Sequence, residues 1–341
     1  MASSSDDVMA DEVHESQFPP ARVPGRGHGW YRGDCHLHSA RSYGGELTPR
    51  QLAAAARASG MDFVAITEHN TADTHGDWAQ LAGDDLLVIL GQEVTTQTGH
   101  WLALGIDPGH VVESRYGIRD DLIGQYVDQV HKSGGLCVVA HPHAPYPGGV
   151  FMYPFDGFDA VEVWNGLWDS DKAWNADNAA AVAEWGRSLA TGLRSGRWLP
   201  AMGNSDTHLK GQIAIPHTVV LADELSVTAI LDGIRAGHTW IAGSPAVELS
   251  LHVTAADRAA GIGERLETHG RPAVVRAVVG GVPSGTVTFH TDRGTAHRET
   301  LTGDRLSIEW QTSAEESASV RVEVRHPGGH AAALTNPVTL I

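Results

Sequence analysis

Cysteine and positive charge are both scarce in this 341-residue sequence. The two cysteines, Cys35 and Cys137, lie in apolar stretches, which favours buried thiols over a disulfide and excludes a structural zinc site built from cysteines. Lysine and arginine number 24 against 41 acidic residues, a formal net charge of −17. Because a nucleic-acid backbone requires a cationic surface, this charge argues against that partner. It suits a small-molecule substrate, above all where a bound cation reverses the local field.

Long apolar runs are also absent, so we expect no membrane-spanning segment and no membrane partner. The opening MASSSDDVMADEVHES is acidic and contains no hydrophobic stretch, so it does not form a secretory signal. We therefore expect a cytoplasmic protein, or a secreted one whose leader was removed. Prolines and glycines crowd into PPARVPGRG, and residues 1–27 are predicted to form a flexible N-terminal arm.

Short apolar runs alternate with helical stretches from residue 30 to about residue 245. In one such unit, Thr48 can cap a helix, Pro49 fits its first turn, and the helix continues to a stop at Gly60. MDFVAIT follows as a buried strand. Repeated units of this kind indicate an α/β sheet covered by helices, either a closed barrel or an open sheet, in which chemistry collects at the carboxyl ends of the strands.

The pattern changes after SPAVELSLHV to five or six short alternating strands separated by Gly, Pro, Asp and Ser turns. This spacing is typical of a small antiparallel β-sandwich. We place the boundary between Gly243 and Ala246. The predicted domains are therefore a barrel over residues 28–245 and a sandwich over residues 246–341.

Histidines and carboxylates fall at the expected strand ends, with one exception at the start of a strand, His100. Imidazole nitrogens and carboxylate oxygens suit zinc, manganese or iron, and a carboxylate can bridge two ions. Alternate residues of a strand face the same side, so a His-x-His pair presents two rings to one point, and an Asp-x-His pair repeats that spacing. The candidates are His36, His38, Glu68, His69, Glu93, His100, His141, Asp206 and His208.

A single histidine is more often a hydrogen-bonded or surface residue than a ligand, and we keep that interpretation for the other histidines. Two of them, His143 and His217, border the expected site and are left out of it. The ordered set of motifs reverses this interpretation and predicts a metal site. Among the acids, Glu68 could orient a ligand, whereas Glu162 is expected to be a buried, hydrogen-bonded structural acid.

The motifs CHLHS, AITEHN, GQEV, GHWLALG, VVAHPH and GNSDTH stand in the order of the PHP (polymerase and histidinol phosphatase) metallohydrolases, which residues 30–245 resemble. The closing TNPVTLI and the β-domain resemble the carbaryl-hydrolase branch (CehA/McbA-like proteins). The resemblance implies a distorted (βα)7 barrel with two or three transition-metal ions at its carboxyl end. It implies phosphoester hydrolysis, with ester and carbamate hydrolysis in the named branch.

The resemblance also implies which residues hold the ions. One metal would be held by Glu93, Asp206 and two histidines, His36 and His38. Glu93 would bridge to a second metal, held by His141 and His100.

A third site in the family uses the equivalents of His69 and His208 together with an acid or histidine of the first loop. Here Tyr43 stands where an aspartate is usual, and tyrosine is a poor ligand for such ions unless ionised. We therefore expect two divalent ions (Mn, Fe or Zn) and leave a third open. His69 and His208 could instead bind substrate or donate a proton.

The predicted function is that of a metal-dependent hydrolase that uses a metal-bridged hydroxide. Our first choice is a phosphoesterase that acts on a small anionic phosphomonoester or phosphodiester. Substrate contacts are expected from Arg41, Trp164, Asn165 and Lys210, although solvation or packing is the ordinary explanation for the two cations and the tryptophan. Nearby aromatic residues and the branch resemblance support an alternative carboxylic ester, carbamate or amide hydrolase. A second alternative is a non-catalytic metal-binding or interaction protein. The oligomeric state and the role of the β-domain are not encoded in any motif.

Overall fold

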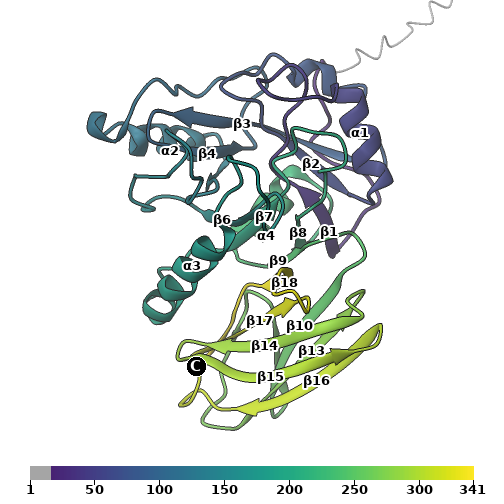
Figure 1. Ribbon diagram of the computed structural model, residues 1–341, viewed down its shortest axis with the longest axis vertical. Coiled ribbons are helices and arrows are strands. Elements are labelled where there is room, and N and C mark those ends of the chain that lie inside the picture. The colour runs from purple at the N-terminus through teal and green to yellow at the C-terminus, as the bar shows by residue number, and fades with distance from the viewer. Residues whose placement is uncertain (1–16) are drawn as a thin grey trace, which may run out of the picture.

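A computed structural model describes residues 17–341 of the chain. The first part is a mixed α/β unit built on a curled sheet, and an all-β region follows it (Figure 1). The sheet runs in the order β8 (His217–Ala222), β1 (Gly29–Asp34), β2 (Phe63–Ile66), β3 (Leu87–Thr96), β4 (Gly99–Leu104), β5 (Leu136–Val139), β6 (Ala160–Asn165) and β7 (Ala201–Asn204). The predicted fold class is confirmed.

Strand direction in this sheet is mixed. The pairs β1–β2, β2–β3, β5–β6 and β6–β7 are parallel, whereas β8–β1, β3–β4 and β4–β5 are antiparallel. The turn between Thr96 and Gly99 is too short for a crossover helix, so β4 must return beside β3 as a hairpin. The start of β4 therefore lies at the same edge as the carboxyl end of β3, and this explains the exceptional position of His100.

Four α-helices of the described residues pack on this sheet: α1 (Pro49–Ala58), α2 (Ile123–Lys132), α3 (Asn178–Gly192) and α4 (Val227–Arg235). Helix α1 begins as expected, because the Thr48 hydroxyl accepts a hydrogen bond from the Gln51 N–H and the Gln51 side chain accepts one from the Thr48 N–H. Its buried face, with Leu52 and Ala56, packs against Val64 of β2. None of the helices in residues 17–341 is long and apolar enough to cross a membrane.

The chain closes the mouth of the curled sheet beyond the strand ends. Leu37, after β1, forms a parallel bridge with Thr207, after β7. The His38 N–H donates to the Thr207 carbonyl at 3.0 Å, and the Thr207 N–H donates to the His36 carbonyl at 3.3 Å. These bonds place the His-x-His and Asp-x-His segments side by side.

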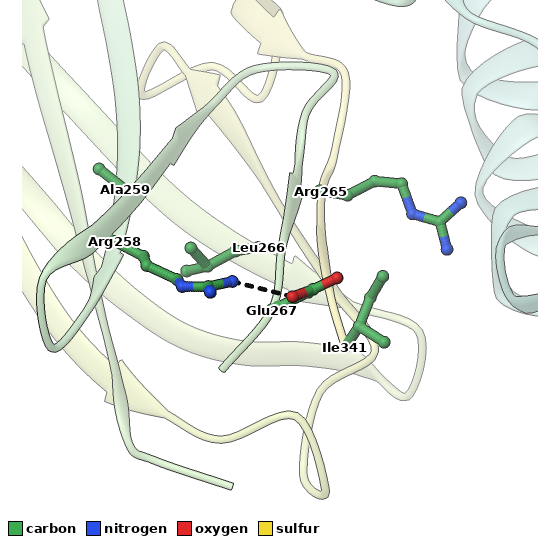
Figure 2. A pocket seen from close by; sticks show the side chains of 6 residues that line it. All are labelled: Arg258, Ala259, Arg265, Leu266, Glu267 and Ile341. Carbon is green, nitrogen blue, oxygen red and sulfur yellow. Dashed lines mark hydrogen bonds and ion pairs between the residues drawn. The ribbon is translucent and has the colours of Figure 1, made fainter. Parts of the chain in front are cut away.

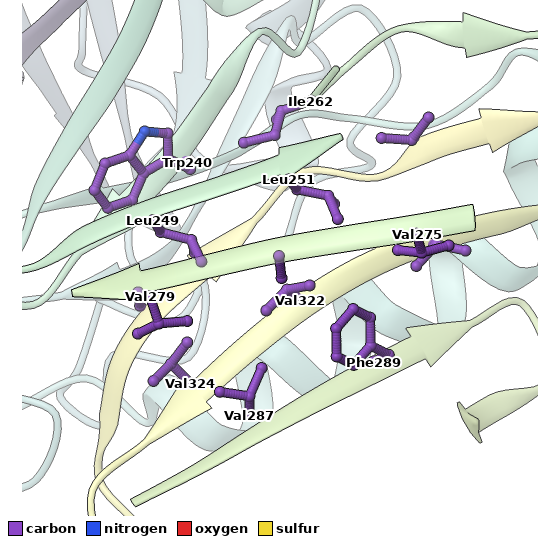
Figure 3. Close-up of a cluster of buried hydrophobic side chains, with 14 of the residues drawn as sticks. Trp240, Leu249, Leu251, Ile262, Val275, Val279, Val287, Phe289, Val322 and Val324 are labelled. Carbon is purple, nitrogen blue, oxygen red and sulfur yellow. The ribbon is translucent and has the colours of Figure 1, made fainter. Parts of the chain in front are cut away.

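The all-β region packs two sheets on a shared apolar core that includes Val275, Val322 and Phe289 (Figure 3). One sheet has the order β11 (Arg258–Gly261), β10 (Glu248–Ala255), β13 (Ala273–Gly280) and β16 (Arg305–Thr312). The other contains β12 (Arg265–Leu266), β19 (Val338–Leu340), β17 (Ser319–Arg325), β18 (Ala331–Thr335), β14 (Ser284–Thr291) and β15 (Gly294–Thr302).

Strand β9 (Thr239–Ala242) joins the two parts, because it pairs with β8 on one side and with β18 on the other. Trp240 of β9 contributes its indole to the core of the all-β region (Figure 3). The predicted domain boundary at residues 245/246 falls in the connection between β9 and β10.

Of the predicted N-terminal arm, residues 1–16 lie outside the described residues. The next part is held in place near α4: Val23 is buried, its N–H donates to the Leu225 carbonyl at 2.9 Å, and Arg22 bridges Ser226. These contacts tie Arg22 and Val23 to the chain before α4, and flexibility of the arm stays a prediction.

Candidate metal centre

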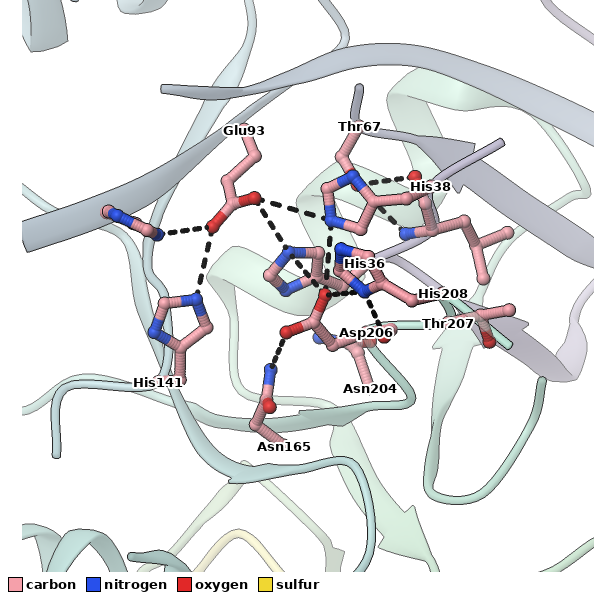
Figure 4. Close-up of polar contacts among 12 residues, drawn as sticks. His36, His38, Thr67, Glu93, His141, Asn165, Asn204, Asp206, Thr207 and His208 are labelled. Atoms are coloured by element: carbon pink, nitrogen blue, oxygen red, sulfur yellow. Dashed lines mark hydrogen bonds and ion pairs between the residues drawn. The ribbon is translucent and has the colours of Figure 1, made fainter. Parts of the chain in front are cut away.

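The histidines and acids of the separate motifs meet at the carboxyl edge of the curled sheet (Figure 4). The His-x-His motif follows β1 and the Asp-x-His motif follows β7, and the bridge between Leu37 and Thr207 holds the two motifs side by side. The bridge between His69 and Glu93 extends the β2–β3 pairing to the same edge. Asp206 and His141 have φ values of 48° and 24°, in the left-handed region that side chains disfavour. Such local strain is concentrated at functional sites.

Four side-chain atoms form the first group: Nε2 of His36, Nε2 of His38, Oε2 of Glu93 and Oδ1 of Asp206. Each nitrogen lies 3.1–3.5 Å from each oxygen. Within residues 17–341 all four atoms are buried without a hydrogen-bond partner. Because buried polar atoms without hydrogen-bond partners cost free energy, this convergence of four favours a compensating group such as a cation.

The distances fit a transition-metal ion as that group. Ligand atoms about 2.1 Å from a tetrahedral ion lie about 3.4 Å from one another. The observed spacings bracket this value, and two imidazoles with two carboxylates are a donor set that zinc, manganese or iron accepts. The residues present therefore fit a divalent ion.

A second group shares Glu93. Its other oxygen, Oε1, lies 2.8 Å from Nδ1 of His100 and 3.1 Å from Nε2 of His141. The two oxygens of one carboxylate thus face two sets of histidines, which is the arrangement expected of a bridging ligand. All six residues assigned to the first two metals lie in this cluster.

A third group contains His38, His69 and His208, whose ring nitrogens lie within 4.8 Å of one another. His69 Nε2 is 3.0 Å from Glu93 Oε2, and its ring stacks on His38 with centroids 4.0 Å apart. Tyr43, at the position of the usual aspartate, is 91% exposed and takes no part. Ser42, which the motif comparison did not single out, approaches instead: its Oγ is 2.7 Å from His69 Nδ1.

Glu162 is the acid that orients the ligands. It accepts hydrogen bonds from His36 Nδ1 at 3.2 Å, the His141 N–H at 3.0 Å, Asn165 Nδ2 at 2.9 Å and Asn204 Nδ2 at 3.0 Å. The bond to Nδ1 directs Nε2 of His36 toward the cluster, as outer carboxylates do in metal sites. The sequence interpretation of Glu162 as a buried, hydrogen-bonded acid therefore describes its surroundings but leaves out its contact with a ligand.

Glu68 has a different place from the one that was expected. Its carboxylate accepts hydrogen bonds from the Ser39 N–H and hydroxyl, and so it holds the loop after His38 rather than orienting a ligand ring.

Charge within the cluster is strongly coupled. Burial alone would lower the pKa of His36, but the carboxylates of Asp206, Glu162 and Glu93 raise it well above its ordinary value. Burial alone would raise the pKa of Asp206, yet His36 and His208 hold it well below its usual range. The site therefore favours ionised acids balanced by positive charge, and a metal ion would supply that charge while displacing protons from the histidines.

The four expected substrate contacts are placed differently from one another. Arg41 is exposed and lies 3.7 Å from Asp77, and Lys210 is exposed at the surface. Trp164 is buried and its Nε1–H donates to the Gly166 carbonyl, so it serves packing. Asn165 donates from Nδ2 to Asp206 Oδ2 at 3.2 Å, and so it contacts a ligand acid directly.

The aromatic residues that we expected near the site include Trp101, Tyr146 and Tyr153, of which Trp101 and Tyr153 are buried. Tyr146 is half-buried, with its ring centroid 5.9 Å from that of His100 and 6.2 Å from that of His141. Burial and the nearby Glu93 raise its pKa, so the phenol stays protonated.

A cavity of about 590 Å³ lies elsewhere, in the all-β region (Figure 2). Its Arg258 is already paired with Glu267 at 2.8 Å. The lining contains none of the histidines of the metal cluster: it comprises Arg258, Ala259, Arg265, Leu266, Glu267 and Ile341.

Comparison with known proteins agrees with this geometry. Residues 34–133 match the family model of the PHP domain, a span that includes His36, His38, His69, Glu93 and His100. The predicted resemblance to the PHP family is confirmed over this span. The protein of Methanocaldococcus jannaschii named uncharacterized protein MJ1587 is 25% identical over 146 residues, which are 39% of this chain and 81% of that protein.

A crystal structure of a two-domain protein from Bacteroides vulgatus, described as containing a predicted PHP-like metal-dependent phosphoesterase, superimposes with a TM-score of 0.50. The match covers 95% of this chain and 99% of that chain at 17% identity. At this identity the likeness shows the fold alone, including the attachment of an all-β region. Membership of the carbaryl-hydrolase branch stays a prediction.

Proposed function

We propose that this protein is a metal-dependent phosphoesterase that hydrolyses a small anionic phosphomonoester or phosphodiester. The observation that carries the proposal is the set of four buried nitrogen and oxygen atoms without hydrogen-bond partners, joined by Glu93 to a second group of histidines. Two divalent ions bound there would activate water and stabilise the charge that develops on the phosphoryl oxygens. Because Arg41 and Lys210 are exposed, the positive field that attracts the substrate comes mainly from such ions.

His208 is our candidate for the proton donor to the leaving group. Its ring is partly exposed, and Nδ1 lies 3.0 Å from the Asp206 carbonyl oxygen, so Nδ1 carries a hydrogen. Nε2 can then take up a proton and, once the ring is an imidazolium with a hydrogen on both nitrogens, hand it to the leaving group. His69 is more deeply enclosed, between Ser42 and Glu93, and suits a ligand or an orienting residue.

Tyr146 supports a second candidate, an ester or carbamate hydrolase. Its half-buried ring stands beside His100 and His141 and offers a flat apolar wall to an aryl or acyl group. A small organic substrate, with neither nucleic acid nor a membrane as partner, remains our proposal in both cases.

Two experiments test the proposal. Elemental analysis of the purified chain counts the bound metal ions. Activity is then measured with added Mn²⁺, Fe²⁺ or Zn²⁺ on four para-nitrophenyl substrates: the phosphate, the bis-phosphate, the acetate and the carbamate. We expect about two ions per chain and hydrolysis of a phosphate ester. Asp206→Asn changes a direct ligand, so it should lose metal and more than the roughly 10–100-fold in kcat/KM that loss of an outer partner of a ligand costs. The exposed Asp85→Asn serves as the control. Hydrolysis of only the acetate or carbamate would favour the ester or carbamate hydrolase. If the chain bound no metal and hydrolysed none of the substrates, both candidate functions would be rejected.

A further inference from the structure

Strand β7 precedes Asp206, and one of its edges lacks a strand partner. Among the described strands β7 pairs only with β6. Side chains supply the hydrogen bonds that a neighbouring strand would otherwise make. At Gly203, the Thr218 hydroxyl of β8 accepts from the N–H at 3.0 Å and donates to the carbonyl at 2.8 Å.

At Ala201 the partner comes from the far end of the chain. The Ala201 N–H donates to Asn336 Oδ1 at 2.8 Å, and Asn336 Nδ2 donates to the Ala201 carbonyl at 3.2 Å. The same amide group also reaches Thr239 of β9, at 3.2 Å from its carbonyl and 2.6 Å from its hydroxyl. A carboxamide carries both a donor and an acceptor, so Asn336 imitates one residue of a neighbouring strand and ties β7 to β9.

Asn336 is itself rigidly held. It is 1% exposed and lies in the TNPVTLI segment between β18 and β19. The preceding Thr335 pairs with Trp240, and the Pro337 carbonyl accepts from the Gly263 N–H at 3.0 Å. The all-β region therefore presents this amide to the base of β7 from a fixed position.

From its base, β7 leads directly into the metal cluster. Asn204 at its end donates to Glu162 and accepts from the Cys35 N–H, and the Ser205 N–H donates to Asp34. Asp206 follows. Metal ligands must be held within about 0.5 Å of their working positions, so a displaced strand weakens the site.

We propose that Asn336 is a positioning residue: through β7 it sets the place of Asp206 and thereby the affinity of the metal centre. The all-β region is then a structural part of the active site rather than an independent attachment. This inference rests on the proposed metal centre.

The test titrates the metal-depleted full-length chain with Co²⁺, following affinity by chelator competition and geometry by the visible absorption of the bound ion. Asn336→Ala should bind Co²⁺ about tenfold more weakly, toward the low end of the loss seen when an outer partner of a ligand is removed. Its absorption spectrum should also change. Val275→Ala, in a core cluster of the all-β region that includes no residue of β7, is the control for general destabilisation. Urea midpoints are measured for every variant.

If Asn336→Ala does not fold, Thr239→Val carries the test, because it keeps the strand and removes the hydroxyl that accepts from the Asn336 amide and itself donates to the Ala201 carbonyl at 3.2 Å. A smaller loss of Co²⁺ affinity is then expected. Wild-type affinity and spectrum in a folded variant would overturn the positioning role while leaving the metal centre intact. The positioning role would also be overturned if Val275→Ala had the same urea midpoint as Asn336→Ala and lost as much Co²⁺ affinity. Failure of the wild-type chain to bind Co²⁺ would instead reject the metal centre itself.

Discussion

Glu162→Gln is the substitution whose effect follows most directly from the geometry. The change keeps the shape of the side chain and replaces one carboxylate oxygen by an NH₂ group. Oε1 faces Asn204 Nδ2, and Oε2 faces the His141 N–H and Asn165 Nδ2. His36 Nδ1 reaches both oxygens, at 3.2 and 3.4 Å. In either orientation of the glutamine, its NH₂ group therefore meets at least one donor, Asn204 Nδ2 at the place of Oε1 or the His141 N–H at the place of Oε2. Asn204 cannot relieve the conflict by turning over, because its Oδ1 already accepts from the Cys35 N–H.

The magnitude comes from the donor left without an acceptor. A buried unsatisfied donor costs about 1–3 kcal/mol, so the variant should lose at least about 1–3 kcal/mol of unfolding free energy in the absence of metal. Loss of the partner that orients His36 should also weaken metal binding by about 10–100-fold. Both effects have the same cause, since the carboxylate holds ligand rings and strand ends together.

Urea unfolding of the metal-depleted chain and competition with a chelator measure the two effects separately. The control is Glu184→Gln, which makes the same chemical change in a residue of α3 whose carboxylate pairs with His143 and is partly exposed. It should alter neither the unfolding free energy nor the metal affinity appreciably. Wild-type metal affinity in Glu162→Gln would refute the orienting role. Normal stability in the same variant would refute the hydrogen-bond accounting.

Three other substitutions probe separate parts of the structure. Burial lowers the pKa of His217 from 6.5 to about 4. The unfolded chain therefore binds a proton at this residue before the folded chain does, and the free energy of unfolding falls by about 3 kcal/mol between pH 6.5 and pH 4. Urea titrations at pH 7 and 4.5 should show a smaller loss for His217→Gln, and an identical loss would contradict this assignment. Thr48→Ala removes the cap of α1 and should cost about 1 kcal/mol in the same assay; an unchanged midpoint would mean that the cap contributes nothing. Tyr146→Ala should raise the KM of an aryl substrate about tenfold with metal content unchanged, whereas Tyr146→Phe should not; a fall in kcat alone would argue against a binding wall.

Local patterns in the sequence predicted much of the site. The His-x-His and Asp-x-His spacings imply side chains on one face, and Thr48 with Pro49 marks the start of a helix, because both signals depend only on neighbouring residues. The family resemblance that the ordered motifs support implied the ligand set of the first two groups. The roles of Glu162 and Ser42 could not be obtained in this way, since an acid in a buried strand and a serine in a loop have many ordinary explanations.

The sequence alone determined the α/β class with its β-rich end, the family resemblance, and which histidines and acids converge. Tertiary structure decided that β4 runs antiparallel, which brings His100 to the cluster, that Tyr43 points into solvent, and that Asn336 supports the base of β7. The physical reason is one of range: periodicity and capping are encoded by adjacent residues, whereas strand direction and an amide contact across 135 positions depend on how the whole chain packs.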